Sequence, residues 1–353
     1  MGLARFTKSS YTPASLVGVV ALGVSRRKSR HALAGRHSVE RTLIVGIDGV
    51  VGANLAMSLS GLQPLAGVAL TAPVCEDVCE QMEVCDSPHL ADALAIADQA
   101  QPQRVVVAGV GANSCWDDHS QVSWERTVES ALAWMSAAQS VGAQFTLISS
   151  DAVFTGPWMF HAENSHSVCP SREANALREI ERQVSLRNPD ALIVRTHAFG
   201  WSPGGEQPAE SWLESLVADL QAGHRPRLDC VRHASPILAT DLAAVLSKAW
   251  TAGLTGLYHI AGAERVNPAQ FARRLAHQFA LPFAGDSAVG SLTDCAQGFG
   301  RGETSLQTRK IRRALGIGLP LVSEGIERLY AQHLNGYRDR MQGRLLAAGP
   351  RVA

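Results

Sequence analysis

The stretch Thr42-Leu-Ile-Val-Gly-Ile-Asp-Gly-Val-Val-Gly52 places three glycines at three-residue steps directly after a short apolar run. The apolar run is typical of a buried β-strand, and residues 51–62 have the apolar content of a helix that packs on a sheet. Gly46 permits a tight turn, Gly49 lets the backbone approach a pyrophosphate, and Gly52 lets the helix lie close to the sheet. The stretch therefore predicts a dinucleotide site formed by Gly46, Asp48, Gly49, Val50, Val51 and Gly52.

The alternation of β-like and helical segments continues to about residue 200. Further β-like runs cover 68–71, 105–108, 145–148 and 192–194, and helical intervals cover 89–101, 124–138 and 171–184. This alternation predicts an α/β fold of the Rossmann type, a doubly wound parallel sheet covered by helices on both faces. Ala108, Gly109 and Ser149 end two of the expected strands, so we assign them to the cofactor side as well.

The pattern changes after Gly200 to helical segments joined by loops that contain proline and glycine. The helical segments are 209–222, 241–251, 267–279 and 308–315, with one β-like run at 257–261. Asn267, followed by Pro268 and by Gln270, predicts a helix cap. Phe271, Leu275 and Phe279 lie on one face of this expected helix and predict a buried face. We therefore expect a Rossmann domain over 41–199 with a return segment at about 237–262, a smaller α+β lobe over 200–236 and 263–334, and a tail over 335–353.

Residues 1–40 differ from the rest because seven basic residues stand against one acid, Glu40, around the apolar run 16–24. This run is too short to span a bilayer. The stronger basic cluster, Arg26-Arg27-Lys28, follows the run, whereas a signal peptide has its positive charge before it. We expect a basic, disordered extension and neither export nor membrane insertion.

The overall composition excludes some classes of partner. Lys plus Arg and Asp plus Glu balance at 32 each, which gives no basic field for nucleic acid. Seven scattered cysteines fit reduced thiols and a cytoplasmic location better than a disulfide framework. The only cluster, Cys75, Cys79 and Cys85, lacks the spacing of a zinc site, so we predict no metal.

Several later stretches follow one another in a recognisable order. They are Leu147-Ile-Ser-Ser-Asp-Ala-Val-Phe-Thr-Gly156, Ile193-Val-Arg-Thr196, Ala234-Ser-Pro236, Asp241-Leu-Ala243, Gly256-Leu-Tyr-His-Ile-Ala-Gly262, Leu306-Gln-Thr-Arg-Lys-Ile311 and Leu315-Gly316. Together they resemble the extended short-chain dehydrogenases, in particular the dTDP-4-dehydrorhamnose reductase family. The resemblance runs from about Thr42 to Leu334.

The resemblance implies NAD(P)H-dependent reduction of a nucleotide-linked keto sugar, with a small C-terminal lobe for the substrate. It assigns Ser150 to the family's catalytic Ser/Thr, and Asp151, Ser235 and Pro236 to the substrate side. It implies a nucleotide-linked sugar or another small molecule as ligand, and a homodimer or a partner enzyme as assembly. The choice between NAD and NADP stays open because no Asp, Glu or Arg occupies 71–73, where the adenine ribose is usually read.

The family's Tyr-x-x-x-Lys pair is missing from this sequence. Its two positions correspond to Ala174 and Arg178, and residues 41–257 contain no tyrosine and a single lysine, Lys248. A phenol titrates near pH ~10 and needs a neighbouring cation to donate a proton at neutral pH. Loss of positioned acid catalysis costs about 10²- to 10⁴-fold in rate. We therefore expect slow turnover at best.

Three hypotheses about this loss are open at the level of sequence. His161 or His166, in a polar loop near Ser150, could serve as a substitute acid, since histidine titrates in the useful range. Alternatively, the chain is a non-catalytic regulatory subunit that binds cofactor or sugar nucleotide, similar to the regulatory subunit of methionine adenosyltransferase. A third hypothesis is a relic that binds neither. Ala174 also fits a core position, and Arg178 fits a solvated charge.

Overall fold

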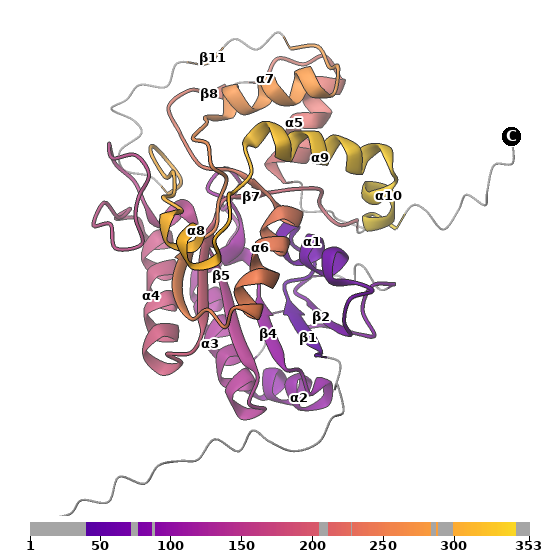
Figure 1. Cartoon of the computed structure of the whole chain (residues 1–353), viewed down its shortest axis with the longest axis vertical. Coiled ribbons are helices and arrows are strands. Elements are labelled where there is room, and N and C mark those ends of the chain that lie inside the picture. Colours follow the sequence, from indigo (N-terminus) through magenta and orange to yellow (C-terminus); the bar gives the residue numbers. More distant parts are fainter. Residues whose placement is uncertain are drawn as a thin grey trace, which may run out of the picture. The chain divides into compact units, whose positions relative to one another are not determined.

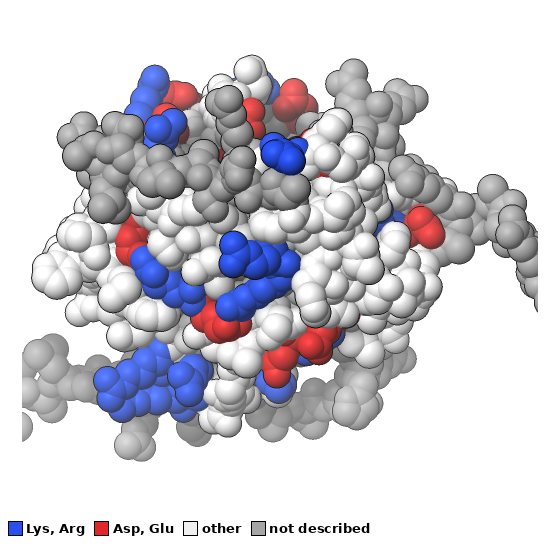
Figure 2. Space-filling view, turned by 90° about the horizontal axis from the view of Figure 1, so that it is seen from above, with Lys and Arg blue, Asp and Glu red and all other residues white. Residues whose placement is uncertain are grey.

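The computed structural model describes residues 40–71, 77–86, 89–204, 211–226, 228–283, 287–288 and 299–343. The expectations for the N-terminal extension up to residue 39, for Cys75 and for the end of the tail lie outside these residues. None of the described helices is long and apolar enough to cross a bilayer. Figure 2 shows acidic and basic side chains in small neighbouring groups on the face seen from above.

A seven-stranded parallel sheet forms the centre of the Rossmann part (Figure 1). Its strands, in spatial order, are β10 (Gly256–His259), β6 (Leu192–Thr196), β5 (Gln144–Ser150), β4 (Arg104–Val107), β1 (Thr42–Val45), β2 (Leu65–Ala69) and β3 (Gln81–Val84). The strand order reverses direction between β1 and β4, and in such sheets ligands bind beyond the carboxyl ends of the strands at this point. The predicted α/β fold with a parallel sheet is confirmed.

Helices cover both faces of the sheet. Helices α1 (Val50–Leu59) and α6 (Ala239–Thr251) pack together on one face, and α2 (Leu90–Ala100), α3 (Trp124–Ser140) and α4 (Arg172–Arg187) pack on the other. Successive residues of one strand serve the two faces: Ile44 packs in the core beneath α1 and α6, and Leu43 in the core beneath α2 and α3. Burial on both faces explains why these strands are continuous apolar runs.

The remaining elements form the second part of the fold and its connections. They are 3-10 turns η1 (Val110–Ala112) and η2 (Asp151–Val153), helices α5 (Trp212–Gln221), α7 (Pro268–Gln278), α8 (Arg309–Leu315), α9 (Val322–Leu334) and α10 (Tyr337–Met341), and the short strand pairs β7 (Ala198–Phe199) with β9 (Ile237–Leu238) and β8 (Leu228–Asp229) with β11 (Ser287–Ala288). The predicted cap of α7 is confirmed as a capping box between Asn267 and Gln270. Phe271 and Leu275 are fully buried, as their spacing predicts. Phe279 is only partly buried, because α7 ends at Gln278 and Phe279 caps it.

Three elements differ from the sequence-based expectation. Strand β3 was not predicted because it is a half-exposed edge strand with two polar residues, Gln81 and Glu83. Helix α9 was not predicted either. Helix α10 lies in the segment expected to be a tail: Tyr337 donates to Asn54 Oδ1 at 3.1 Å, and Met341 is buried. These contacts attach the start of the supposed tail to helix α1.

Candidate cofactor cleft and the contacts behind it

The glycine turn between β1 and α1 has the steric properties that its sequence predicts. Gly46 has φ +81°, and a Cβ there would lie 2.6 Å from Gly109 Cα. A Cβ on Gly52 would lie 2.1 Å from the Gly46 carbonyl oxygen, so only glycine lets α1 approach the turn. Gly49 meets nothing closer than 3.4 Å. The turn is therefore compact and leaves its outer backbone open to a ligand.

Asp48 fastens this turn to the end of β2. Its Oδ2 accepts hydrogen bonds from Leu70 N at 2.9 Å, from Thr71 N at 2.7 Å and from Thr71 Oγ1 at 2.8 Å. Two backbone N–H groups and a hydroxyl thus stabilise the carboxylate on the side of β2. The Asp48 carboxylate, which the sequence places at the expected dinucleotide site, therefore accepts the hydrogen bonds that hold the turn.

A cavity of about 500 Å³ opens along the carboxyl ends of β1, β2, β4 and β5. This volume is typical of small-molecule sites. The predicted residues Gly46, Asp48, Gly49, Gly109 and Ser149 line it. Further lining residues that the sequence analysis did not single out include Thr71, Asp86, Asn113, Ser123, Arg126 and Thr127.

Four other residues assigned to the cofactor do not line the cleft. Val51, Gly52 and Ala108 are buried beneath it, and Val50 is half-buried at the start of α1. They support the turn and do not offer atoms to a ligand. The ionisable side chains among the lining residues are Asp48, Asp86 and Arg126.

The positions of the missing catalytic pair lie in the first turns of α4. Ala174 is fully buried, and its N–H donates to Ser171 Oγ, which caps the helix. Arg178 donates to the carbonyl oxygens of Cys169 at 2.7 Å and of Val153 at 3.4 Å. Its pKa is lowered by burial. Arg178 is therefore a structural tie between α4 and the preceding loop, in contrast to the solvated charge that the sequence suggested.

Ser149 is joined to a buried ion pair that the sequence analysis missed. Its Oγ donates to Glu181 Oε1 at 2.7 Å, and Arg195 donates to both Glu181 oxygens at 2.9 and 2.6 Å. Both charged side chains are at most 8% exposed. Glu181 follows Ala174 by seven residues, which places it on the buried face of α4; this spacing was the available signal. Ser149 presents lone pairs to the cleft, because its proton is engaged by Glu181.

The two loop histidines do not reach the cleft. His161 is buried, its ring stacks on Phe154 with centroids 4.5 Å apart, and its nitrogens lie 3.1 Å from Ser165 Oγ and from Glu303 O. Burial lowers its pKa. His166 is exposed. Neither residue lines the cofactor cavity. The structure thus does not bring the two proposed substitute acids to the site, because one imidazole is used in packing and the other faces solvent.

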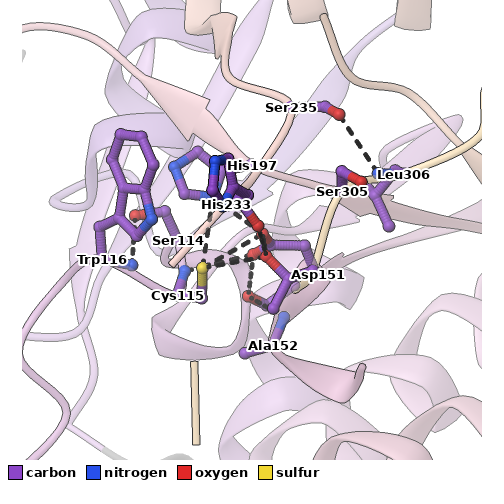
Figure 3. A network of polar contacts seen from close by, with 12 residues as sticks. Ser114, Cys115, Trp116, Asp151, Ala152, His197, His233, Ser235, Ser305 and Leu306 are labelled. Carbon is purple, nitrogen blue, oxygen red and sulfur yellow. Dashed lines mark hydrogen bonds and ion pairs between the residues drawn. The ribbon is translucent and has the colours of Figure 1, made fainter. Parts of the chain in front are cut away.

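Asp151 lies in a buried polar cluster (Figure 3), and the preceding residue, Ser150, is buried as well. Asp151 Oδ2 accepts from His197 Nδ1 at 2.9 Å and from Thr304 Oγ1 at 2.6 Å. Ser150 Oγ donates to Asp151 Oδ1 at 3.3 Å. Burial would raise the pKa of Asp151, but His197 and the hydroxyl of Thr304 outweigh this effect and lower it. The carboxylate therefore joins the end of β5 to β6 and to the segment before α8.

The residues assigned to the substrate side are enclosed in the same region. Asp151, Ser235 and Pro236 are buried, and Ser235 Oγ accepts from Leu306 N at 3.3 Å. The Pro236 carbonyl approaches Gly262 so closely that a Cβ there would lie 2.1 Å away. None of the three, and not Ser150, lines the cofactor cavity. Their polar atoms hold segments of the fold together.

Cys115, Asp151 and His197 are the group within the described ranges whose donor atoms could surround a metal ion. The thiol lies 3.2 Å from Asp151 Oδ2 and 3.6 Å from His197 Nδ1. Burial, followed by the Asp151 charge, raises the pKa of Cys115, which opposes formation of the thiolate that a metal requires. Hydrogen bonds join the three side chains, although His197 Nε2 is buried without a hydrogen-bond partner among the described residues. The absence of a metal stays a prediction.

The sequence model of the family described as RmlD substrate binding domain matches residues 40–334. The chain belongs to this family. No curated protein matches the sequence at a significant level. The match covers both the Rossmann part and the second part of the fold, and therefore includes the cofactor cleft and the Asp151 cluster.

Solved structures of this type share the fold with low sequence identity. The dTDP-4-dehydrorhamnose reductase of Bacillus anthracis str. Ames in complex with NADP has a TM-score of 0.67 and 17% identity, over 83% of this chain and 99% of that chain. The enzyme WbmH of Bordetella bronchiseptica in complex with NAD+ has a TM-score of 0.66 and 16% identity, over 85% and 99%. The dTDP-glucose 4,6-dehydratase of Bacillus anthracis str. Ames in complex with NAD has a TM-score of 0.66 and 10% identity, over 84% and 98%.

Proposed function

We propose that this RmlD-family chain binds NAD(P) in the cleft at Gly46, Gly49 and Gly109, and that it lacks the proton donor for efficient reduction of a keto sugar. The observation that carries the proposal is the open glycine turn, whose outer backbone lines a cavity of about 500 Å³. The complexes of its structural neighbours with NADP and NAD+ support the same assignment. The nicotinamide would supply or accept a hydride.

The side chains around this cleft supply little of the remaining chemistry. The hydroxyl proton of Ser149 is directed to Glu181, and that of Ser150 to Asp151. Ala174 offers no proton, and Arg178 is engaged with backbone carbonyls. A reductase of this kind must protonate the alkoxide that hydride transfer creates. We therefore favour a subunit that binds cofactor and sugar nucleotide and regulates a partner enzyme over a fast reductase.

We also propose that the chain divides into two parts. The Rossmann domain covers 41–199 with the return segment 237–262, and a lobe over 200–236 and 263–334 binds the sugar nucleotide. Asp151 joins the two parts by its hydrogen bond with Thr304, and the carbonyl oxygens of Ser235 and Pro236 contact Gly262 of the return segment. A regulatory role would use this connection to transmit the effect of a ligand in one part to the other.

The experiment is a calorimetric titration of the full chain with NADH and, separately, with NADPH. We expect saturable binding of at least one. Gly49→Val should abolish it, because the side chain would occupy the surface that approaches the pyrophosphate, whereas Gly318→Val, with nothing within 4 Å of its Cβ, should bind as the wild type does. The absence of binding of either nucleotide would overturn the proposal.

Turnover is measured separately by single-turnover oxidation of the bound cofactor with a dTDP-4-keto sugar. We expect a rate at least 10²-fold below that of a dTDP-4-dehydrorhamnose reductase assayed alongside, which is the lower end of the contribution of general acid catalysis. Equal rates would show that another group donates the proton and would reject the regulatory reading.

A further inference from the structure

A second cavity, of about 520 Å³, lies beside helix α8 and shares no lining residue with the cofactor cleft. Its wall combines the start of α8, the loop after β10 and the loop that ends at Phe160. The residues that carry the argument are Phe160, Arg309, Arg312 and Arg313. These three arginines lie in the lobe proposed for the sugar nucleotide, so the inference drawn from this cavity rests on that part of the proposed function.

Three guanidinium groups line the cavity from one side of α8. Arg309, Arg312 and Arg313 stand at i, i+3 and i+4, spacings at which helical side chains are neighbours and like charges repel. All three are exposed, and none takes part in an ion pair within the described part of the chain. Lys310 points elsewhere: it donates to Leu257 O at 2.6 Å and lies over the ring of Tyr258.

The acidic residues nearest in sequence to the cavity wall are engaged with other groups. Glu264 accepts from Arg274 at 3.0 Å, and Glu303 accepts from Arg265 at 2.7 Å. Glu163 accepts from His259 N at 3.1 Å. These carboxylates are therefore not directed at the three arginines. The cavity has an excess of positive charge that a bound anion would balance.

Phe160 adds an aromatic wall in a strained backbone conformation. Its φ is +54°, in the left-handed region that bulky residues rarely adopt. The conformation is held by hydrogen bonds from Phe160 N to Ser305 Oγ and from His161 N to Ser305 O, both 2.8 Å. Phe160 remains 41% exposed, beside the more exposed Trp158 and Met159. Such strain persists only where the surroundings impose it, and it is concentrated at ligand sites.

We propose that this cavity binds a phosphorylated small molecule with an aromatic part, such as a nucleoside diphosphate. Arg309, Arg312 and Arg313 contact the phosphates, and Phe160 packs against the ring. Guanidinium groups suit this role because their paired N–H donors match two phosphate oxygens at once. The site shares no lining residue with the cofactor cleft, so its ligand is not the reductant.

The test is a calorimetric titration of the full chain with pyrophosphate and with UDP, both with and without saturating NADPH. The Arg312→Glu/Arg313→Glu variant should weaken both ligands at least tenfold. Arg225→Glu, which reverses an exposed arginine outside the cavity, should leave both affinities within twofold. Arg312→Gln/Arg313→Gln should also weaken both ligands, but by less. This variant replaces the charge reversal in the test if the charge reversal unfolds the protein. Circular dichroism checks the fold of each variant.

Two further variants test which part of the ligand Phe160 contacts and whether the two cavities bind their ligands independently. Phe160→Ala should weaken UDP and leave pyrophosphate unchanged, because only UDP has a ring. Gly49→Val, which obstructs the cofactor cleft, should still bind UDP, so this proposal and the cofactor proposal fail independently. Unchanged affinity in both Arg312/Arg313 variants, competition between NADPH and UDP, or no binding of either probe would overturn the proposal.

Discussion

The carboxylate of Glu181 accepts two hydrogen bonds from Arg195 and one from Ser149, which places a buried ion pair directly behind the wall of the cofactor cleft. Two charges that are at most 8% exposed require each other, because either one alone would be buried without a partner. The pair also fixes the orientation of the Ser149 hydroxyl, and so it affects the cleft as well as the core.

Removal of one partner of the Glu181–Arg195 ion pair should destabilise the fold. We expect Glu181→Ala to lower the free energy of unfolding by about 3 to 5 kcal/mol, and Glu181→Met/Arg195→Met to recover much of this loss. Urea denaturation of the purified variants measures both. Glu179→Ala removes an exposed partner of Arg182 and should leave the free energy of unfolding almost unchanged, because solvent screens this pair. Equal losses for Glu181→Ala and Glu179→Ala would contradict the structural role of the buried pair.

Asp48 should control cofactor affinity through the glycine turn. We expect Asp48→Ala to weaken binding of the nicotinamide nucleotide by about tenfold, because the loss of three hydrogen bonds frees the turn from β2. Asp48→Asn retains an acceptor and removes the charge, so it should bind at least as tightly as the wild type. If Asp48→Asn is as weak as Asp48→Ala, the charge and not the hydrogen bonding governs the turn.

The sequence predicts those features whose cause is local. The glycine turn, the capping box at Asn267 and the strands buried on both faces each leave a pattern within a few residues. Strand β3 leaves none, because an exposed edge strand needs no apolar run. The partners of Asp151 were missed for a different reason: Cys115, His197 and Thr304 come from three distant segments of the chain. Their partners are set by the packing of the fold.

Burial of His259 should make the protein sensitive to acid. Desolvation, and then the charge of Arg195, lowers the pKa of His259 to about 3. In the unfolded chain this imidazole titrates near pH ~6.5. Below that pH the unfolded state binds a proton that the folded state does not, so stability falls as the pH drops from about 6.5 towards 3. His259→Gln should flatten this slope in urea unfolding curves recorded across the interval, and an unchanged slope would assign it to other groups.

The ionisation of Asp151 should affect the stability of the protein in a lower pH range than that of His259 does. Its folded pKa is lowered by His197 and Thr304 against the effect of burial, so its stabilisation is fully present above about pH 3.9, the unfolded value. It is lost as the pH falls through the folded value. Asp151→Asn should be less stable than the wild type at pH 7 and should lose less on acidification below pH ~4. Thermal unfolding in citrate buffers compares the two proteins. If the melting temperatures of the two proteins decline in parallel on acidification, Asp151 is not ionised in the folded state.

Restoring the family's catalytic residue types should not restore catalysis. Ala174 is fully buried and does not line the cleft, so a tyrosine there would have to displace core packing before its hydroxyl reached a substrate. Arg178→Lys would lose at least one of the two carbonyl contacts that tie α4 to Val153 and Cys169. We expect Ala174→Tyr/Arg178→Lys to lower the melting temperature and to raise the single-turnover rate less than tenfold. Ala174→Ser is the control, because it adds a hydroxyl group with little increase in side-chain volume. A gain of 10²-fold or more in the double variant would show that the fold still accommodates the pair, and that its loss alone accounts for the slow reaction.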